Sequence, residues 1–115
     1  MRVWLIGAGH IGTVALRQLL KNPAVEIFVS DPSDQPEAVL SGLIDRVDLI
    51  ANISPVNVNE IARRVRPDLI LLSPGIGEQG FGAIEGSKAL SEALNYETII
   101  ASEYPCLILS LSNQS

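Results

Sequence analysis

The chain has 115 residues, a formal net charge of −5 and 47% hydrophobic residues, with a mean hydropathy of +0.30. This length suits a single domain with one hydrophobic core. The eight lysines and arginines are scattered along the chain, so no nucleic-acid partner is expected, because nucleic acids require a basic surface. No apolar run approaches the roughly 20 residues that span a bilayer, so a membrane location is not expected either.

The cysteine content and the N-terminal segment predict a cytoplasmic protein. Cys106 is the only cysteine, which excludes an internal disulfide and a multi-cysteine metal site. Only Met1 and Arg2 precede the first apolar segment, and Gly7 interrupts that segment, so no signal-peptide core is visible. With one histidine in the chain, no metal site is predicted.

Short, nearly continuous apolar runs alternate with longer helix-like stretches over the first 72 residues. Such runs are typical of strands that are buried on both faces of a parallel sheet. We expect strands at residues 2–6, 25–30, 47–53 and 69–72. We expect helices at residues 36–43, at 57–65 and at 10–21, the last with Ile11, Val14, Ala15 and Leu19 facing the sheet. The alternation predicts an α/β fold.

The second part of the chain predicts a loop and helix followed by two strands. Residues 74–82 are rich in glycine and predict a loop, and residues 83–94 predict a helix. Strands are expected at residues 98–101 and 106–111, with four residues between them. Four residues are too few for a parallel crossover, so the last strand is expected to be antiparallel. The prediction is a single domain over residues 1–115 with a doubly wound, mostly parallel sheet of about six strands in the order 3-2-1-4-5-6.

A glycine motif lies between the first expected strand and the first expected helix. Gly7, Gly9 and Gly12 form the pattern G-x-G-x-x-G, and its remaining positions are Ala8, His10 and Ile11. Gly7 permits a tight turn, Gly9 lets a phosphate approach the backbone, and Gly12 lets the helix lie close to the strand. The N–H groups at the helix N-terminus can then bind a pyrophosphate without a basic side chain.

An acidic residue completes the motif. Asp31 lies 19 residues after Gly12, at the end of the second expected strand, where its carboxylate can accept hydrogen bonds from both ribose hydroxyls. The four residues after Asp31 include no cation to neutralise a 2′-phosphate, so NAD is predicted rather than NADP. Further ligand contacts are expected beside Asp31 and where the third and fourth strands end, at Pro32, Ser54, Pro55, Ser73 and Pro74.

In this motif the chain resembles the NAD(P)-binding Rossmann family. In compactness it is similar to the N-terminal dinucleotide domain of saccharopine-dehydrogenase-like proteins and to the nucleotide-binding domains that regulate potassium transport. The resemblance covers the first strand, GAGHIG and Asp31. It implies that Gly7, Gly9 and Gly12 line the pyrophosphate and that Asp31 holds the adenosine ribose. Both comparisons place such a domain beside another module, which implies an assembly.

Two classes of function stay open. The first is a non-catalytic NAD(H)-binding module that senses the nucleotide, acting as a homodimer through the apolar last strand or with a separate partner chain. The alternative is an NAD-dependent oxidoreductase whose substrate site is completed by oligomerisation, by a partner or by the loop at residues 74–82. Binding of CoA or another nucleotide is a minor alternative. No catalytic residue is predicted.

Overall fold

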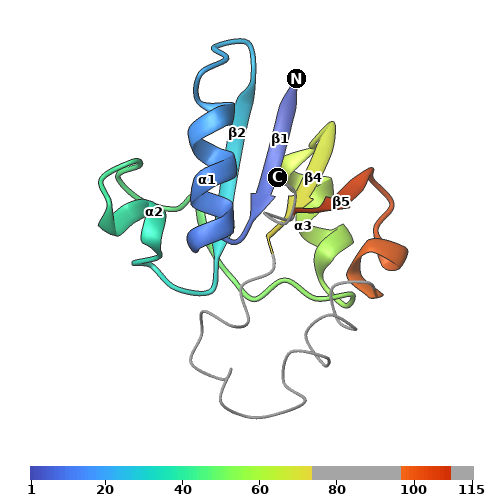
Figure 1. Cartoon of the computed structure of the whole chain (residues 1–115). Helices are drawn as coiled ribbons and strands as arrows, with labels where there is room; N and C mark the ends of the chain where they lie inside the picture. The colour runs from blue at the N-terminus through green and yellow to red at the C-terminus, as the bar shows by residue number, and fades with distance from the viewer. Residues whose placement is uncertain (74–96, 110–115) are drawn as a thin grey trace.

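A parallel sheet with helices on both faces organises residues 1–73 and 97–109, the part of the chain that the computed structural model describes (Figure 1). The strands are β1 (Arg2–Ile6), β2 (Glu26–Asp31), β3 (Leu49–Ile50), β4 (Leu69–Leu72) and β5 (Cys106–Ile108). The helices are α1 (His10–Leu19), α2 (Glu37–Leu40) and α3 (Val58–Val65), and residues 97–101 are also helical. The strand order is β3-β2-β1-β4-β5, and every neighbouring pair is parallel.

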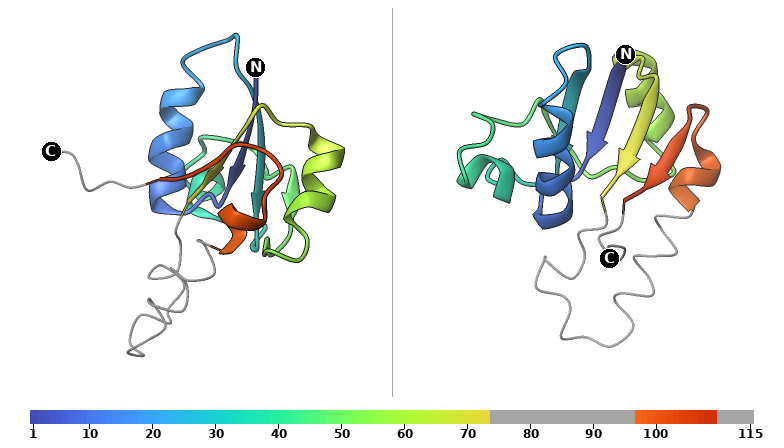
Figure 2. Two further views of the ribbon diagram at one scale, coloured as in Figure 1. Left: turned by 90° about the vertical axis from the view of Figure 1, so that its right-hand side faces the viewer. Right: turned by 45° about the horizontal axis from the view of Figure 1, so that its top comes forward.

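The central strand β1 is buried on both faces of the sheet. Its side chains alternate, so that Val3 and Leu5 pack on the side of α1 and α2, whereas Trp4 and Ile6 pack on the side of α3. Figure 2 shows α1 and α3 on opposite sides of the sheet. The structure therefore confirms the predicted α/β class with helices on both faces.

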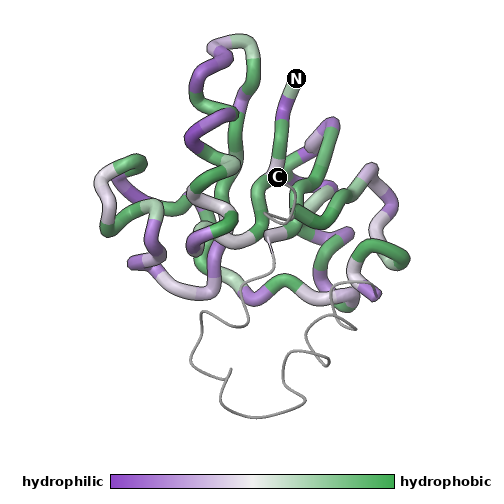
Figure 3. Tube along the Cα trace, in the orientation of Figure 1, coloured by the Kyte–Doolittle hydropathy of each residue, from purple (hydrophilic) through white to green (hydrophobic). Residues whose placement is uncertain are grey.

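Hydrophobic residues concentrate in the strands, as the hydropathy colours along the trace in Figure 3 show. The largest fully buried side chain is Trp4, whose Nε1–H donates a hydrogen bond of 2.9 Å to Ser30 Oγ. This bond satisfies the one polar group of the indole inside the core. Among the described helices, none is long and apolar enough to cross a membrane.

The prediction for the end of the sheet was wrong. Residues 98–101, expected as a strand, are helical, and β5 pairs parallel with β4 through Ile70↔Cys106 to Leu72↔Ile108. The segment between β4 and β5 runs from residue 73 to 105, which is ample for a parallel crossover. Within the described residues, the expected six strands in the order 3-2-1-4-5-6 are therefore replaced by five in the order 3-2-1-4-5.

The element bounds agree with the sequence for β1 and β4 and differ elsewhere. α1 ends at Leu19, and the expected strand at 47–53 and helix at 36–43 shrink to β3 and α2. On α1 the buried residues are Gly12, Thr13 and Leu16. The side of the helix that faces the sheet is therefore rotated about the helix axis from the side that the sequence predicted. The loop expected at residues 74–82 and the helix expected at 83–94 lie outside the described residues.

A core truncation on β4 tests this packing. Ile70 is fully buried beneath α3, so Ile70→Ala should lower the free energy of unfolding by about 2–5 kcal/mol. The matched change Ile100→Ala removes the same atoms from a side chain that is 81% exposed, and should alter stability by less than about 0.5 kcal/mol. Urea unfolding followed by the fluorescence of Trp4 measures both; equal losses would contradict the assigned core.

Candidate functional site

The glycine motif forms a tight turn between β1 and α1. Gly7 has a φ of +96°, which L side chains rarely adopt, and its N–H donates to the carbonyl of Ser30 at 2.7 Å. A Cβ at Gly12 would lie 2.1 Å from the Gly7 carbonyl oxygen, so only glycine allows the helix to lie this close to the strand. The steric roles predicted for Gly7 and Gly12 are therefore confirmed.

The carboxylate of Asp31 braces this turn from the end of β2. Oδ1 accepts the N–H of Ala8 at 2.8 Å, and Oδ2 accepts the N–H of Ser33 at 2.9 Å. Asp31 is only 5% exposed, and the two hydrogen bonds compensate for its burial. Each carboxylate oxygen has a second lone pair, so the bracing bonds leave accepting capacity for a ligand hydroxyl.

The short helix α2 is attached to the same turn. The carbonyl of Ala8 accepts the N–H of Ala38 at 3.1 Å and the hydroxyl of Thr13 at 3.1 Å. His10, in the first turn of α1, has its Nδ1 3.4 Å from Glu37 Oε2 at the surface. These contacts hold the start of α2 beside the start of α1.

A hollow of about 270 Å³ lies between the turn, the end of β2 and the start of α2. Its lining consists of Gly9, His10, Asp31, Ser33, Gln35, Pro36 and Glu37. The two parts of the sequence motif, the glycine loop and Asp31, thus contribute to one concave surface. Asp31 and Glu37 supply two carboxylates to it, and the described residues of the lining include no lysine or arginine.

Ser73 reaches the glycine turn from the end of β4. Its N–H donates to the carbonyl of Ile6 at 2.8 Å, and its Cβ lies 3.1 Å from where a Cβ at Gly7 would be. Its hydroxyl is buried 3.3 Å from the corresponding position at Gly12 and has no hydrogen-bond partner among the described residues. Such an unsatisfied hydroxyl costs about 1–3 kcal/mol, so this position holds unused hydrogen-bonding capacity beside the loop.

The other predicted contact residues lie in different surroundings. Ser54 and Pro55 form the turn before α3, where Ser54 N–H donates to Asn57 Oδ1 at 2.8 Å, and neither residue lines the hollow. Pro32 follows Asp31 at the surface, and Pro74 lies outside the described residues. Sequence reasoning missed Glu37; its place in the first turn of the helix after Asp31 is the signal that indicates it.

Comparison with known proteins assigns no family to this chain. A scan against protein-family models and a search of the curated proteins each found no match. Within residues 1–73 and 97–109, no three His, Cys, Asp or Glu side chains are placed to hold a metal ion. What the site can do must therefore be inferred from its own donors, acceptors and shape.

The close contact at Gly12 predicts that replacing this helix glycine by alanine lowers the stability of the fold, which is the opposite of the usual effect. Gly→Ala inside a helix normally stabilises by about 0.5–1 kcal/mol, but Gly12→Ala must displace α1 from the Gly7 carbonyl and should destabilise instead. Gly42→Ala is the control, because a Cβ there meets no atom within 4 Å and only the strain of its φ of +81° is added. Urea unfolding should show the larger loss for Gly12→Ala; a gain in stability would contradict the close packing.

The cysteine of β5 is predicted to be chemically inert. Burial raises the pKa of the Cys106 thiol to about 11, so at pH 8 it forms roughly 100-fold less thiolate than an exposed cysteine. Alkylation by iodoacetamide should be slower by about that factor in the folded chain than in urea, and should accelerate as the pH approaches 11. Mass spectrometry of timed samples measures the rate, and equal rates at pH 8 would contradict the burial of this thiol.

Proposed function

We propose that this domain binds NAD at the carboxyl edge of the sheet and acts as a sensing or regulatory module within a larger assembly. The observation that carries the proposal is that Gly9, His10 and Asp31, from the two separated parts of the motif, line one hollow. In open α/β sheets ligands bind in such a place, beyond the carboxyl ends of the strands.

The residues of the turn fit the parts of a dinucleotide. The N-terminus of α1 has no side-chain cap, and the first N–H groups of a helix lack partners within the helix, so they can donate to a pyrophosphate. The outward lone pairs of Asp31 can accept the ribose hydroxyls while its bonds to Ala8 and Ser33 persist.

The charges around the hollow favour NAD over related nucleotides. NADP and CoA both carry a phosphate on the adenosine ribose, and that phosphate would lie near Asp31 and Glu37, with no lysine or arginine among the described residues of the lining. Like charges a few ångströms apart repel one another, and the cost rises where water is excluded. CoA is therefore disfavoured for the same reason as NADP.

An NAD-dependent oxidoreductase would use the same nucleotide site and stays the alternative. It requires a substrate surface beside the nicotinamide, and no contact among the described residues favours it over binding alone. Assembly as a homodimer is part of the proposal: β5 lies at one edge of the described sheet, and its Leu107 is 58% exposed. An edge strand with an exposed apolar side chain can pair with a second copy.

The proposal predicts a selective thermal shift. NAD, NADH and AMP at millimolar concentration should raise the melting temperature, because a ligand at 100 times its Kd adds about 2.7 kcal/mol to the stability of the native state. NADP and CoA should give a clearly smaller rise. Differential scanning fluorimetry measures the melting temperature of the chain with each of the five ligands. If no dinucleotide raises the melting temperature, the nucleotide site does not exist and the glycine turn is purely structural.

A conservative variant separates binding from folding. Asp31→Asn keeps an oxygen for the Ala8 N–H but removes the charge and half of the accepting atoms, so the affinity for NAD should fall about tenfold or more. Asp34→Asn removes the same charge from an exposed neighbour and serves as the matched control. Calorimetric titration gives the affinities and circular dichroism verifies the fold; equal NAD affinity in both variants would contradict the role of Asp31.

A further inference from the structure

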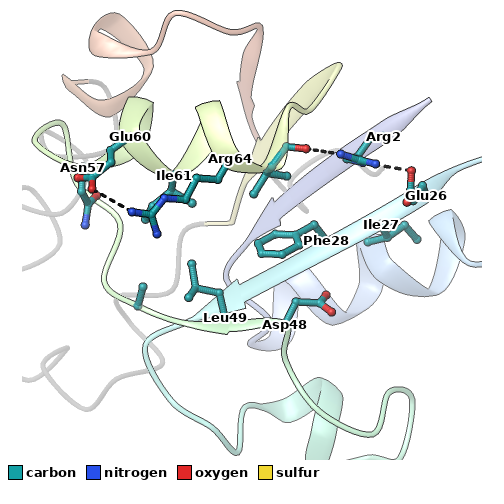
Figure 4. Close-up of a pocket in the computed structure, with 12 residues that line it drawn as sticks. Arg2, Glu26, Ile27, Phe28, Asp48, Leu49, Asn57, Glu60, Ile61 and Arg64 are labelled. Carbon is teal, nitrogen blue, oxygen red and sulfur yellow. Dashed lines mark hydrogen bonds and ion pairs between the residues drawn. The ribbon is translucent and has the colours of Figure 1, made fainter.

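A second and larger cavity, of about 650 Å³, lies between α3 and the strands β2 and β3 (Figure 4). It shares no lining residue with the hollow beside the glycine turn. Its volume falls within the roughly 300–1,000 Å³ that is typical of small-molecule sites. The nucleotide proposal does not involve this cavity.

The cavity exists because α3 covers only part of its face of the sheet. α3 packs through Val58, Ala62 and Val65 against a cluster centred on Trp4 and Ile70, which belong to β1 and β4. Parallel sheets are normally buried on both faces, yet on this face, among the residues that the structure describes, only the edge of α3 lies beside β2 and β3. The half-buried side chains left there are those of Phe28, Leu49, Ala51 and Ile61.

One end of the cavity is closed by a paired charge. Arg2 donates through Nη1 to the carbonyl of Val65 and through Nε to Glu26 Oε1 at 3.1 Å, as the dashed lines in Figure 4 show. The guanidinium therefore compensates Glu26 and the carboxyl end of α3, which carries a partial negative charge. At this end of the cavity the charges of Arg2 and Glu26 therefore compensate each other.

Opposite charges lie on the two walls. Arg64 stands on the α3 wall, with Nη2 3.5 Å from Glu60 Oε2, a long contact between two exposed side chains. Asp48 stands on the strand wall, where Oδ2 accepts the N–H of Val29 at 2.8 Å and leaves Oδ1 outside that bond. Phe28 and Leu49 form the apolar floor next to Asp48 in Figure 4. An apolar floor thus separates the carboxylate of Asp48 from the long Arg64–Glu60 ion pair of α3, in which a ligand carboxylate can take the place of Glu60 beside Arg64.

We propose that this cavity binds a free amino acid with an apolar or aromatic side chain. Such a ligand is a zwitterion at neutral pH, because an α-amino group titrates near pH 8 and an α-carboxyl near 3.5. Its ammonium pairs with Asp48, its carboxylate pairs with Arg64, and its side chain covers Phe28, Leu49 and Ile61. A simple amine satisfies one wall and a simple carboxylic acid the other, whereas the amino acid satisfies both. Since Arg64 is exposed, we expect an affinity of about millimolar.

Titration with L-phenylalanine and two blocked forms tests the charge requirement. N-acetyl-L-phenylalanine lacks the ammonium and L-phenylalaninamide lacks the carboxylate, while both keep the ring. Each should bind at least about fivefold more weakly than L-phenylalanine in chemical-shift or calorimetric titrations of the full chain. Equal binding of all three forms would overturn the zwitterion site. The absence of L-phenylalanine binding at concentrations up to about 20 times the expected millimolar Kd would overturn it as well.

Variants locate the bound amino acid. Asp48→Asn keeps an oxygen for the Val29 N–H and should weaken binding about tenfold, and Arg64→Gln should weaken it about threefold. Arg63→Gln, on the same helix but paired with Glu103, and Asp45→Asn, at an exposed loop position, are the matched controls and should bind normally. If Asp48→Asn and Arg64→Gln also bind normally, the ligand lies elsewhere and the proposal fails.

Two further variants keep this test separate from the nucleotide site. Ile61→Trp places a bulky indole ring on the half-exposed wall and should weaken binding by occupying the apolar surface that the ligand side chain covers, while leaving the affinity for NAD unchanged. Asp31→Asn should leave L-phenylalanine binding unchanged, since Asp31 lines only the other hollow. Unchanged amino-acid binding in Ile61→Trp would overturn the assignment of the cavity, whatever the result with NAD.

Discussion

The contact between Gly12 and the carbonyl of Gly7 is the constraint on which the functional edge of this fold depends. A side chain at Gly12 would have its first carbon 2.1 Å from that oxygen, so α1 can begin directly over the end of β1 only because the residue has none. The turn between β1 and α1 directs the Ala8 N–H toward the end of β2. Because β1 and β2 pair in parallel with Ile6 beside Ser30, the next residue, Asp31, lies where its carboxylate can accept that N–H.

The bracing of Asp31 connects the stability of the turn with its capacity to bind a ligand. The carboxylate is buried, and without the N–H groups of Ala8 and Ser33 it would carry the full penalty of desolvation. With them, it is fixed in place before any ligand arrives. A ribose that donates to the remaining lone pairs meets an acceptor that has already lost its side-chain freedom, so less entropy is lost on binding.

The sequence predicted the inner part of the fold well, because the burial of β1 and β4 leaves an unambiguous apolar pattern. It failed at residues 98–101, where Thr98, Ile99 and Ile100 favour a strand by local propensity. These residues are helical, with Ile99 packed against the cluster on the α3 side and Ile100 exposed to solvent. Tertiary packing decided between the two states, and the false strand then made the last connection look too short for a parallel crossover.

The sites differ in how far the sequence could reveal them. The glycine turn directly follows β1, and Asp31 is the last residue of β2. Their spacing along the sequence was therefore sufficient to predict that they lie together. Glu37 enters the hollow because the Ala38 N–H binds the Ala8 carbonyl, and the cavity beside α3 depends on how far that helix extends across the sheet. Neither relation is encoded at a fixed spacing, so the larger cavity left no signal in the periodicity, and the signal for Glu37 was only its place in the first turn of the helix after Asp31.

An acidic chain can bind the proposed anionic ligand because the groups that attract the pyrophosphate differ from the groups that select among nucleotides. In the proposed site, attraction to a pyrophosphate would come from backbone N–H groups and the dipole of α1, which need no lysine or arginine and act within the first helical turn. Selection comes from side chains: Asp31 accepts hydroxyls, and Asp31 and Glu37 repel any additional phosphate on the ribose. A net charge of −5 thus weakens long-range attraction of nucleotides, whereas the choice among them at the proposed site would rest on the two local carboxylates.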